Sequence, residues 1–207
     1  MRNPKGTRLI SMSLYGDLDM YIKGAKVAVE TYKQFYPNWD LRIYCSEQID
    51  LDCEVVVMGE SHGHSGMFWR FKPIWEEGIN RVIVRDTDSR FSYKETAAVQ
   101  AWIESGKVCH SMHDHEHHRS FPLFGGMFGM KCNVVQDMSR KLRIAMNLEQ
   151  ARVDDMKWLQ RYLWPYVGGD TLHHSSVPLK WEWKEFPLQE EGHFIGQQHG
   201  DDGPIWR

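Results

Sequence analysis

The sequence predicts a single α/β domain with a mostly parallel central sheet and helices on both faces. Hydrophobic strands alternate with amphipathic helices through the first half of the chain, an order typical of parallel sheets. The length of 207 residues suits one domain that buries a sizeable core. The sequence contains no internal repeat, low-complexity tract or long linker that would mark a second domain.

The elements of the first half follow from hydrophobic periodicity. Residues 7–15 are predicted to form an apolar strand. Apolar residues then recur every three or four positions from Leu18 to Tyr36, which predicts an amphipathic helix ended by Pro37. Residues 80–84 are almost continuously apolar, as expected for a buried parallel strand. The same reasoning predicts strands at 41–45, 54–58 and 107–112, and helices at 67–77 and 94–105.

The alternation changes beyond Met112. A His-rich loop is followed by a Gly-rich strand at 123–131, one or two helices between 134 and 166, and an aromatic tail. Ligands of open α/β sheets collect at the carboxyl ends of the strands. Because Tyr15 and the triplet Asp86–Asp88 both follow predicted strands, we expect them to lie in one crevice.

Composition and charge limit the class of protein. Hydrophobic residues make up 42% of the chain and charged residues 26%, as in ordinary folded domains. The net charge of −3 lacks the basic excess that drives nucleic-acid binding. The sequence has no apolar run of membrane-spanning length and no signal-peptide core, and its four cysteines lack CxxC spacing. We therefore expect a cytoplasmic protein with reduced thiols and no membrane span.

The pair Asp86 and Asp88 is the strongest candidate for chemistry among three Asp-x-Asp triplets. Asp17–Asp19 fits a helix start and Asp50–Asp52 fits a turn. The third pair follows a buried strand and is flanked by Arg85 and Arg90, whose guanidinium groups suit phosphate. Magnesium and manganese ions commonly bind one or two carboxylates together with substrate phosphates. The alternative is an exposed turn with surface Asp–Arg pairs.

Four further segments occur in an order that matches a known family. They are DMYIKGAKV (19–27), WRFKPIWEEGINRVIVRDTDSR (69–90), VDDMKWL (153–159) and GHFIG (192–196). Together they resemble the GT-A fold glycosyltransferases, and most closely the glycogenin and lipooligosaccharide galactosyltransferase group, whose DXD motif holds a divalent metal on a nucleotide-sugar. The resemblance implies a single Rossmann-like GT-A domain, with residues 1–112 as the nucleotide-binding half and residues 113–207 as the acceptor-side half.

The resemblance also implies roles for individual residues. Asp86, Asp88 and His193 would be the metal ligands. The family's Lys-Pro-Trp is replaced by residues 197–199, which leaves His199 as an alternative third ligand. The other implied positions are Tyr21 at the nucleotide base, Arg70 at the donor, and Asp154 and Asp155 beside the sugar, where Asp155 replaces the family's Gln.

Two other segments have open interpretations. Five histidines lie in the segment from His110 to His118. Three interpretations stay open: a zinc site, a hydrogen-bonding loop over the acceptor, or an ordinary polar loop. Within it, Asp114 and His115 are candidate sugar or acceptor contacts. Gly125 and Gly126 either let the backbone approach a sugar closely or form a bend in the strand.

These observations predict a metal-dependent glycosyltransferase that uses Mn²⁺ or Mg²⁺ and a nucleoside diphosphate-sugar donor, with UDP-sugars favoured by the resemblance. The donor site comprises Tyr15, Tyr21, Arg70, Arg85, Asp86, Asp88, Gly125 and Gly126. The acceptor is a glycan, a protein, a small molecule or a modified nucleic-acid base. The resemblance implies retention, whereas inversion requires a carboxylate base, for which Asp114, Asp154 and Asp155 are candidates. The alternatives are a metal-dependent hydrolase or phosphoesterase that uses the His-rich loop, and a non-catalytic nucleotide- or carbohydrate-binding module.

Overall fold

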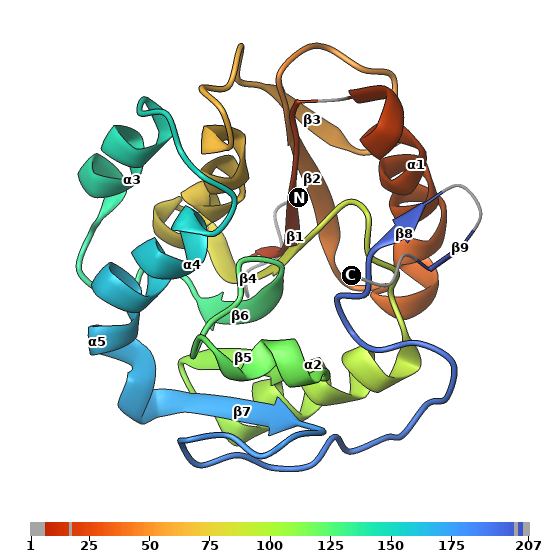
Figure 1. Cartoon of the computed structure of the whole chain (residues 1–207), viewed down its shortest axis with the longest axis vertical. Helices are drawn as coiled ribbons and strands as arrows, with labels where there is room; N and C mark the ends of the chain where they lie inside the picture. The colour runs from red at the N-terminus through yellow and green to blue at the C-terminus, as the bar shows by residue number, and fades with distance from the viewer. Residues whose placement is uncertain (1–6, 17, 201–202, 205–207) are drawn as a thin grey trace.

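The computed structural model describes residues 7–16, 18–200 and 203–204, and it contains one seven-stranded sheet with helices packed against it (Figure 1). The strand order is β3-β2-β1-β4-β6-β5-β7. The strands are β1 (Thr7–Leu14), β2 (Asp40–Cys45), β3 (Glu54–Val57), β4 (Ile79–Arg85), β5 (Cys109–His113), β6 (Met127–Lys131) and β7 (Thr171–Ser175). A separate two-stranded sheet comprises β8 (His199–Gly200) and β9 (Gly203–Pro204).

The sheet is mostly parallel, as the sequence predicts. β1 pairs in parallel with β2 and β4, β3 pairs in parallel with β2, and β7 pairs in parallel with β5. β6 runs antiparallel to both of its neighbours, β4 and β5. Strands from both sides of the predicted boundary at residues 112 and 113 therefore belong to one sheet.

Helices cover both faces of this sheet (Figure 1). They are α1 (Leu18–Phe35), α2 (Tyr93–Ser105), α3 (Ser139–Met146), α4 (Asp154–Trp158) and α5 (Trp164–Val167), with a π-helical turn, η3 (Leu159–Leu163), and 3-10 helices η1 (Ser65–Trp75), η2 (Glu116–Arg119) and η4 (Gly168–Asp170). Side chains alternate along a strand. Val82 and Val84 of β4 therefore pack with Phe71 of η1, whereas Ile83 packs on the other face with Trp102 of α2.

The helix predicted at 67–77 is instead the 3-10 helix η1, which lies almost wholly buried against the sheet. Pro73 lies inside it. Proline has no N–H to donate, and its ring would collide with the carbonyl of Trp69 in an α-helix. The tighter 3-10 hydrogen-bond pattern keeps the segment helical and buries Arg70 beside the sheet.

Strand β7 is an element that the sequence pattern does not predict. Its residues Thr171–Ser175 include two adjacent histidines that interrupt the apolar run. Both are buried because their rings form hydrogen bonds within the sheet: His174 Nδ1 lies 2.9 Å from Nε2 of His110, and His173 Nδ1 lies 3.2 Å from Nε2 of His113. Paired imidazoles thus replace hydrophobic side chains at the edge of the core.

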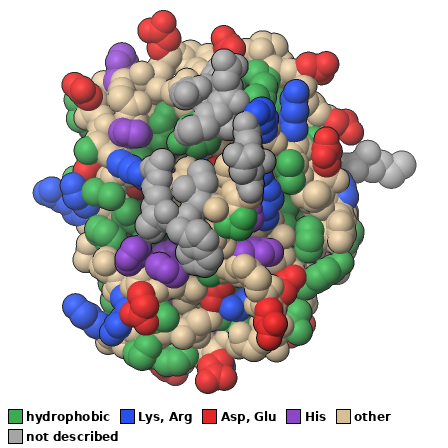
Figure 2. Space-filling model, turned by 45° about the vertical axis from the view of Figure 1, so that its right-hand side comes forward, with side chains coloured by type: hydrophobic (Ala, Val, Ile, Leu, Met, Phe, Trp, Pro, Cys, Tyr) green, Lys and Arg blue, Asp and Glu red, His purple; other side chains and the backbone are tan. Residues whose placement is uncertain are grey.

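The surface agrees with the modest net charge. Acidic and basic side chains are interspersed over the face drawn in Figure 2. Asp50 and Asp52 are exposed in the loop between β2 and β3, as expected for a turn, whereas Asp17 and the side chain of Asp19 lie outside the described residues. Every helix in the described part of the chain is too short or too polar to cross a bilayer.

Candidate functional site

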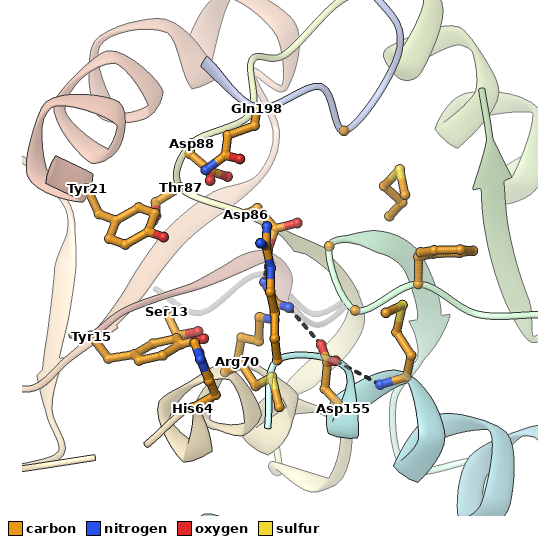
Figure 3. A pocket seen from close by; sticks show the side chains of 18 of the residues that line it. Ser13, Tyr15, Tyr21, His64, Arg70, Asp86, Thr87, Asp88, Asp155 and Gln198 are labelled. Atoms are coloured by element: carbon orange, nitrogen blue, oxygen red, sulfur yellow. Dashed lines mark hydrogen bonds and ion pairs between the residues drawn. The ribbon is translucent and has the colours of Figure 1, made fainter. Parts of the chain in front are cut away.

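A cavity of about 610 Å³ lies where β1 and β4 end (Figure 3). Eight residues that the sequence predicts at a donor or catalytic site line it. They are Tyr15, Tyr21, Arg70, Asp86, Asp88, Gly125, Gly126 and Asp155. These residues come from segments far apart in the sequence, and the carboxyl edge of the sheet brings them together as open α/β sheets commonly do.

Arg70 joins two of the cavity carboxylates. Its Nη1 donates a short hydrogen bond to Oδ1 of Asp86, and its Nη2 donates to Oδ2 of Asp155 at 3.0 Å. The Asp155 side chain is only 5% exposed, whereas that of Asp86 is 41% exposed. Burial raises the pKa of Asp155, and the nearby Arg70 guanidinium opposes this shift. A planar guanidinium can make both contacts at once, which fixes the two carboxylates relative to each other.

Gly125 and Gly126 let these charged groups lie directly against the backbone. A Cβ atom added at Gly125 would collide with the carboxylate of Asp155 and with Nη2 of Arg70. One added at Gly126 would collide with the carboxylate of Asp86. The structure places both residues in the turn before β6. Here the missing side chains make room for the protein's own ion pairs.

Asp88 is the second carboxylate of the predicted pair. Burial, and next the negative charge of Asp86, raise its pKa to about 6, and a hydrogen bond from the Gln198 side chain opposes the shift. The backbone N–H of His199 donates to the Asp88 carbonyl at 2.8 Å. Two mutually repelling carboxylates in one cavity suit a divalent cation whose other ligands are phosphate and water oxygens.

The third metal ligand predicted at His193, or alternatively at His199, is not assembled with this pair. Neither histidine lines the cavity, and their rings pack in a T-shaped arrangement with centroids 5.7 Å apart. Among the described residues no three His, Cys, Asp or Glu side chains gather so that they could hold a metal ion. The chain turns at Gly196 with a φ of 81°, so Gly196 and Gln198 face the cavity instead.

Two tyrosine side chains, those of Tyr15 and Tyr21, form another part of the cavity lining. Tyr15 follows β1 and Tyr21 lies on α1, and Figure 3 shows both on the same side, with His64 beside Tyr15. The Tyr15 ring meets His64 and Trp69 edge-on, with centroids 6.3 and 6.1 Å apart. Burial raises the pKa of the Tyr15 hydroxyl well above its usual range. Such rings offer flat surfaces for a base or a sugar.

Arg85, which the sequence predicts at the donor site, does not line the cavity. Its side chain is buried on the other face of the sheet, where Nε donates to Glu95 at 2.7 Å and Nη1 donates to the carbonyls of Val84 and Phe128 at 2.7 and 3.1 Å. Glu95 also accepts a hydrogen bond from Tyr36 at 2.6 Å. Side chains alternate along β4, so the residue before Asp86 points away from the cavity.

Asp154 and Asp114, both predicted near the sugar, also lie outside the cavity lining. Asp154 closes the first turn of α4, where it accepts hydrogen bonds from Lys157 and from the N–H of Ala151, each at 2.8 Å. Asp114 is buried, and its carboxylate is engaged by Lys94 at 2.6 Å. Of the three candidate bases, Asp155 is the one that faces the cavity.

The histidine loop is a hydrogen-bonded structure. Nδ1 of His113 lies 2.7 Å from the carbonyl of His118, and Nδ1 of His118 accepts from the N–H of Asp114 at 3.1 Å. Nδ1 of His115 accepts from the N–H of His117 at 3.3 Å. The loop histidines do not form a metal cluster within the described residues, whereas His118 lines the cavity.

Comparisons with known proteins support the fold. No family model matches the chain, and no curated protein matches it. A glycosyltransferase involved in the glycosylation of the major capsid of PBCV-1 is similar in structure: 17% of residues are identical, 82% of each chain is covered and the TM-score is 0.50. This likeness shows a shared fold.

Two other solved structures are similar at lower scores. One is 4-diphosphocytidyl-2C-methyl-D-erythritol synthase from Anaerococcus prevotii, with 8% identity, coverage of 88% of this chain and 90% of that chain, and a TM-score of 0.49. The other is Rv0371c from Mycobacterium tuberculosis in complex with manganese, with 10% identity, coverage of 87% and 89%, and a TM-score of 0.46.

Sequence reasoning missed Arg152, which lines the cavity just before α4. Its side chain is exposed, and no hydrogen bond or ion pair engages it within the described part of the chain. Arg70, in contrast, is already neutralised by Asp86 and Asp155. Arg152 is therefore a cavity cation available to an anionic ligand, and its position directly before the predicted VDDM segment is the signal that could have identified it.

Proposed function

We propose that the protein is a metal-dependent glycosyltransferase that moves a sugar from a nucleoside diphosphate-sugar to an acceptor. The observation that carries the proposal is the carboxylate pair Asp86 and Asp88 in one cavity with two tyrosines, at the carboxyl edge of a sheet that shares its fold with a glycosyltransferase. UDP-sugars are the favoured donors, on the resemblance of the Tyr21 segment. The acceptor class is a glycan, a protein, a small molecule or a modified nucleic-acid base.

Asp86 and Asp88 would hold Mn²⁺ or Mg²⁺, which stabilises negative charge on the departing diphosphate. Arg70 keeps the carboxylate of Asp86 in place beneath that site. Tyr15 and Tyr21 provide stacking surfaces for the base. Arg152 attracts the anionic part of the donor.

Asp155 is the residue best placed to act beside the sugar. Its buried carboxylate is fixed by Arg70 and can accept a hydrogen bond from a sugar hydroxyl. The resemblance to glycogenin-like enzymes favours retention, for which no strong base is needed. If the reaction inverts, Asp155 is the base candidate that lines the cavity.

The two alternative functions predict different ligands and different products. A hydrolase with two metals would need ligands from the His-rich loop, but the rings of His113 and His118 are committed to hydrogen bonds within that loop. A non-catalytic binding module would bind the donor without turnover. Both alternatives are therefore separable from a transferase by measuring products as well as binding.

The direct test is a donor screen. UDP-, GDP-, CMP- and dTDP-sugars are titrated with and without Mn²⁺, and melting temperature and slow donor hydrolysis are followed. At a ligand concentration of 100 Kd, binding raises Tm by roughly 5 to 10 °C. We expect a metal-dependent shift with a UDP-sugar that Asp88→Asn abolishes and Asp154→Asn, an aspartate outside the cavity, retains.

Four outcomes would contradict the proposal. The first is that none of the donors binds in a metal-dependent manner. The second is that Asp88→Asn binds the donor as the wild type does. Either result would show that the carboxylate pair is not a metal and donor site. Phosphate release from a simple ester without a nucleotide-sugar indicates the hydrolase. Donor binding that never leads to sugar transfer or donor hydrolysis indicates the binding module.

A further inference from the structure

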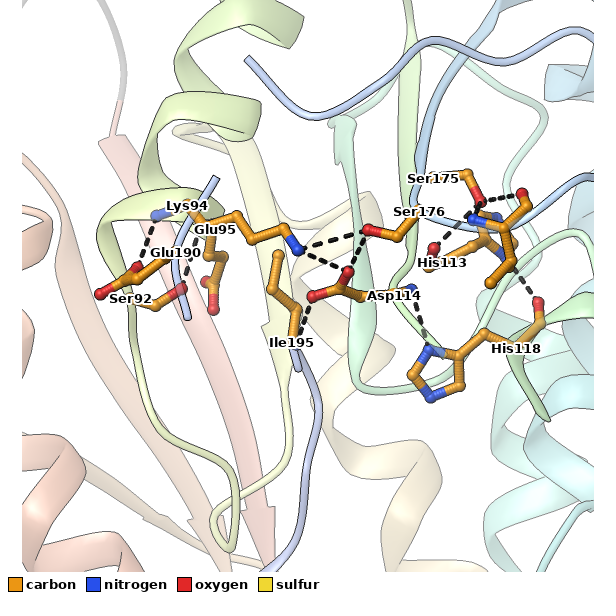
Figure 4. Close-up of polar contacts among 11 residues, drawn as sticks. Ser92, Lys94, Glu95, His113, Asp114, His118, Ser175, Ser176, Glu190 and Ile195 are labelled. Atoms are coloured by element: carbon orange, nitrogen blue, oxygen red, sulfur yellow. Dashed lines mark hydrogen bonds and ion pairs between the residues drawn. The ribbon is translucent and has the colours of Figure 1, made fainter. Parts of the chain in front are cut away.

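A buried polar cluster around Asp114 ties three parts of the fold together (Figure 4). Asp114 directly follows β5, and its side chain is 2% exposed. The Lys94 ammonium, from the first turn of α2, donates to its Oδ1 at 2.6 Å. The Ser176 hydroxyl, just after β7, donates a short hydrogen bond to the same oxygen and accepts from Lys94 at 3.3 Å. One carboxylate oxygen is thus fully engaged by the sheet and α2.

The other oxygen of Asp114 holds the C-terminal segment that we name the strap, residues 190–199. The backbone N–H of Ile195 donates to Oδ2 of Asp114 at 2.9 Å. Glu190, at the start of the strap, accepts from the backbone N–H of Lys94 at 3.0 Å. The Lys94 ammonium also lies 4.6 Å from the centre of the Phe186 ring, just before the strap. The pair Lys94 and Asp114 therefore anchors the strap at two points.

The part of the strap beyond Ile195 forms one wall of the cavity. Gly196 and Gln198 line it. The N–H of His199 donates to the Asp88 carbonyl at 2.8 Å. The contact of Ile195 with Asp114 and the contact of His199 with Asp88 are thus separated by only a few residues of the strap. Loss of the hydrogen bond at Ile195 can therefore displace His199, because only a short, partly buried segment of backbone joins the two residues.

We propose that Asp114 is a positioning residue that holds the strap against Asp88. It touches no ligand itself, and it acts through the amide of Ile195 on Gln198 and His199. Its effect on donor binding rests on the proposed function, whereas its effect on the strap does not. A buried carboxylate with every oxygen engaged suits this role, since removing it leaves the buried Lys94 without its partner and frees the Ile195 amide.

The test compares Asp114→Ala with Ser175→Ala. Ser175 is a buried neighbour whose hydroxyl oxygen lies 3.0 Å from the carbonyl of His113 and 2.6 Å from that of Val177, so its one hydrogen is satisfied within this pair. Its contacts are with the last residue of β5 and with the loop after β7 rather than with the strap. The readout is amide hydrogen exchange of Ile195 and His199 in the ligand-free protein. Each rate is divided by that of a core amide in β4, so that a general loss of stability cancels.

We expect Asp114→Ala to raise the normalised exchange of both strap amides at least about tenfold. The KM for the UDP-sugar with Mn²⁺ should rise about tenfold to a hundredfold, with a smaller change in kcat. Ser175→Ala should leave both quantities unchanged. If Asp114→Ala fails to fold, the double variant Asp114→Asn, Lys94→Met replaces it. This variant removes the charge pair but keeps an oxygen that can accept the Ile195 N–H, so strap protection should return to within about threefold of wild type.

Each outcome decides the proposal. Unchanged strap exchange in Asp114→Ala, or unprotected strap amides in the double variant, overturns the anchor. Raised exchange with unchanged donor KM shows that Asp114 is a structural residue without a positioning role. If the wild-type protein binds no nucleotide-sugar, the proposed function fails, and exchange of the His199 amide still decides whether Asp114 holds the strap against Asp88.

Discussion

Nη2 of Arg70 lies 3.0 Å from Oδ2 of Asp155, although the two residues are 85 positions apart. Through this contact and the one to Asp86, η1 connects the end of β4 to the start of α4. A single buried guanidinium thus sets the separation of two carboxylates that line the cavity. Its removal should affect both stability and ligand binding.

We expect Arg70→Met to lower the free energy of unfolding by about 3 kcal/mol, because it leaves Asp155 buried without its cation. Donor binding should be lost as well. Urea denaturation and nucleotide titration measure the two effects. The control is Arg119→Met, which removes an exposed ion pair with Glu116 and should cost about 1 kcal/mol or less. Equal costs for the two variants would show that the Arg70 pairs contribute little.

Gly126→Ala should disturb the carboxylate pair, because the added methyl group would occupy the position of the Asp86 carboxylate. We expect a loss of about 1 to 3 kcal/mol in stability and weaker Mn²⁺-dependent donor binding. Gly169→Ala is the matched control, since a Cβ there meets no atom within 4 Å. Thermal unfolding with and without donor measures both variants. A Gly126→Ala protein with wild-type stability and affinity would contradict the close approach.

Arg152→Gln should weaken binding of the anionic donor about tenfold while changing stability by less than about 0.5 kcal/mol. The side chain is exposed at the cavity and has no partner to lose among the described residues. Titration at two salt concentrations should show a smaller salt dependence in the variant. Arg140→Gln, an exposed arginine on α3, is the control. Equal donor affinities for the two variants would place Arg152 outside the donor site.

The buried histidines should make the fold sensitive to acid. Burial lowers the pKa of His113 to about 4 and that of His173 to about 3, compared with about 6.5 in an unfolded chain. Between these values the unfolded chain binds protons that the folded chain does not. The stabilisation is therefore complete above pH 6.5 and is lost as the pH falls toward 4, by up to about 1.4 kcal/mol per pH unit for each site.

Urea denaturation at pH 7.5, 6.0 and 5.0 tests this expectation. An unfolding free energy that stays constant between pH 7.5 and 5.0 would show that these imidazoles take up protons as readily in the folded protein as in the unfolded one.

Hydrophobic periodicity was sufficient to predict the main strands, because each buries alternating or continuous apolar residues. It could not predict β7, where paired histidines satisfy one another across neighbouring strands. It also assigned a regular helix to η1, where Pro73 enforces a tighter one. These elements depend on partners or backbone restrictions that a local pattern of hydrophobicity does not contain.

For the site, the sequence placed Asp86 and Asp88 at the carboxyl edge of the sheet because the pair follows a buried strand, and both residues line the cavity there. The expectation that Arg85 lies at the cavity treated neighbours in sequence as neighbours in space, although side chains alternate along β4 and place Arg85 on the other face. The partners of Asp114 and Asp155 could not be predicted, since Lys94 and Arg70 reach them across the fold. Such pairings depend on tertiary geometry rather than on spacing along the chain.

The first turn of α2 also limits how the chain can change in length. Lys94 faces Asp114, while the next residue, Glu95, faces Arg85. Successive helix positions are about 100° apart. An insertion of one residue between Asp88 and this turn would bring lysine to arginine, and a deletion of one residue would bring glutamate to aspartate, each a repulsive contact in the interior. The length of the segment that carries the carboxylate pair is therefore fixed by charge, and natural variants should differ there by substitution and not by length.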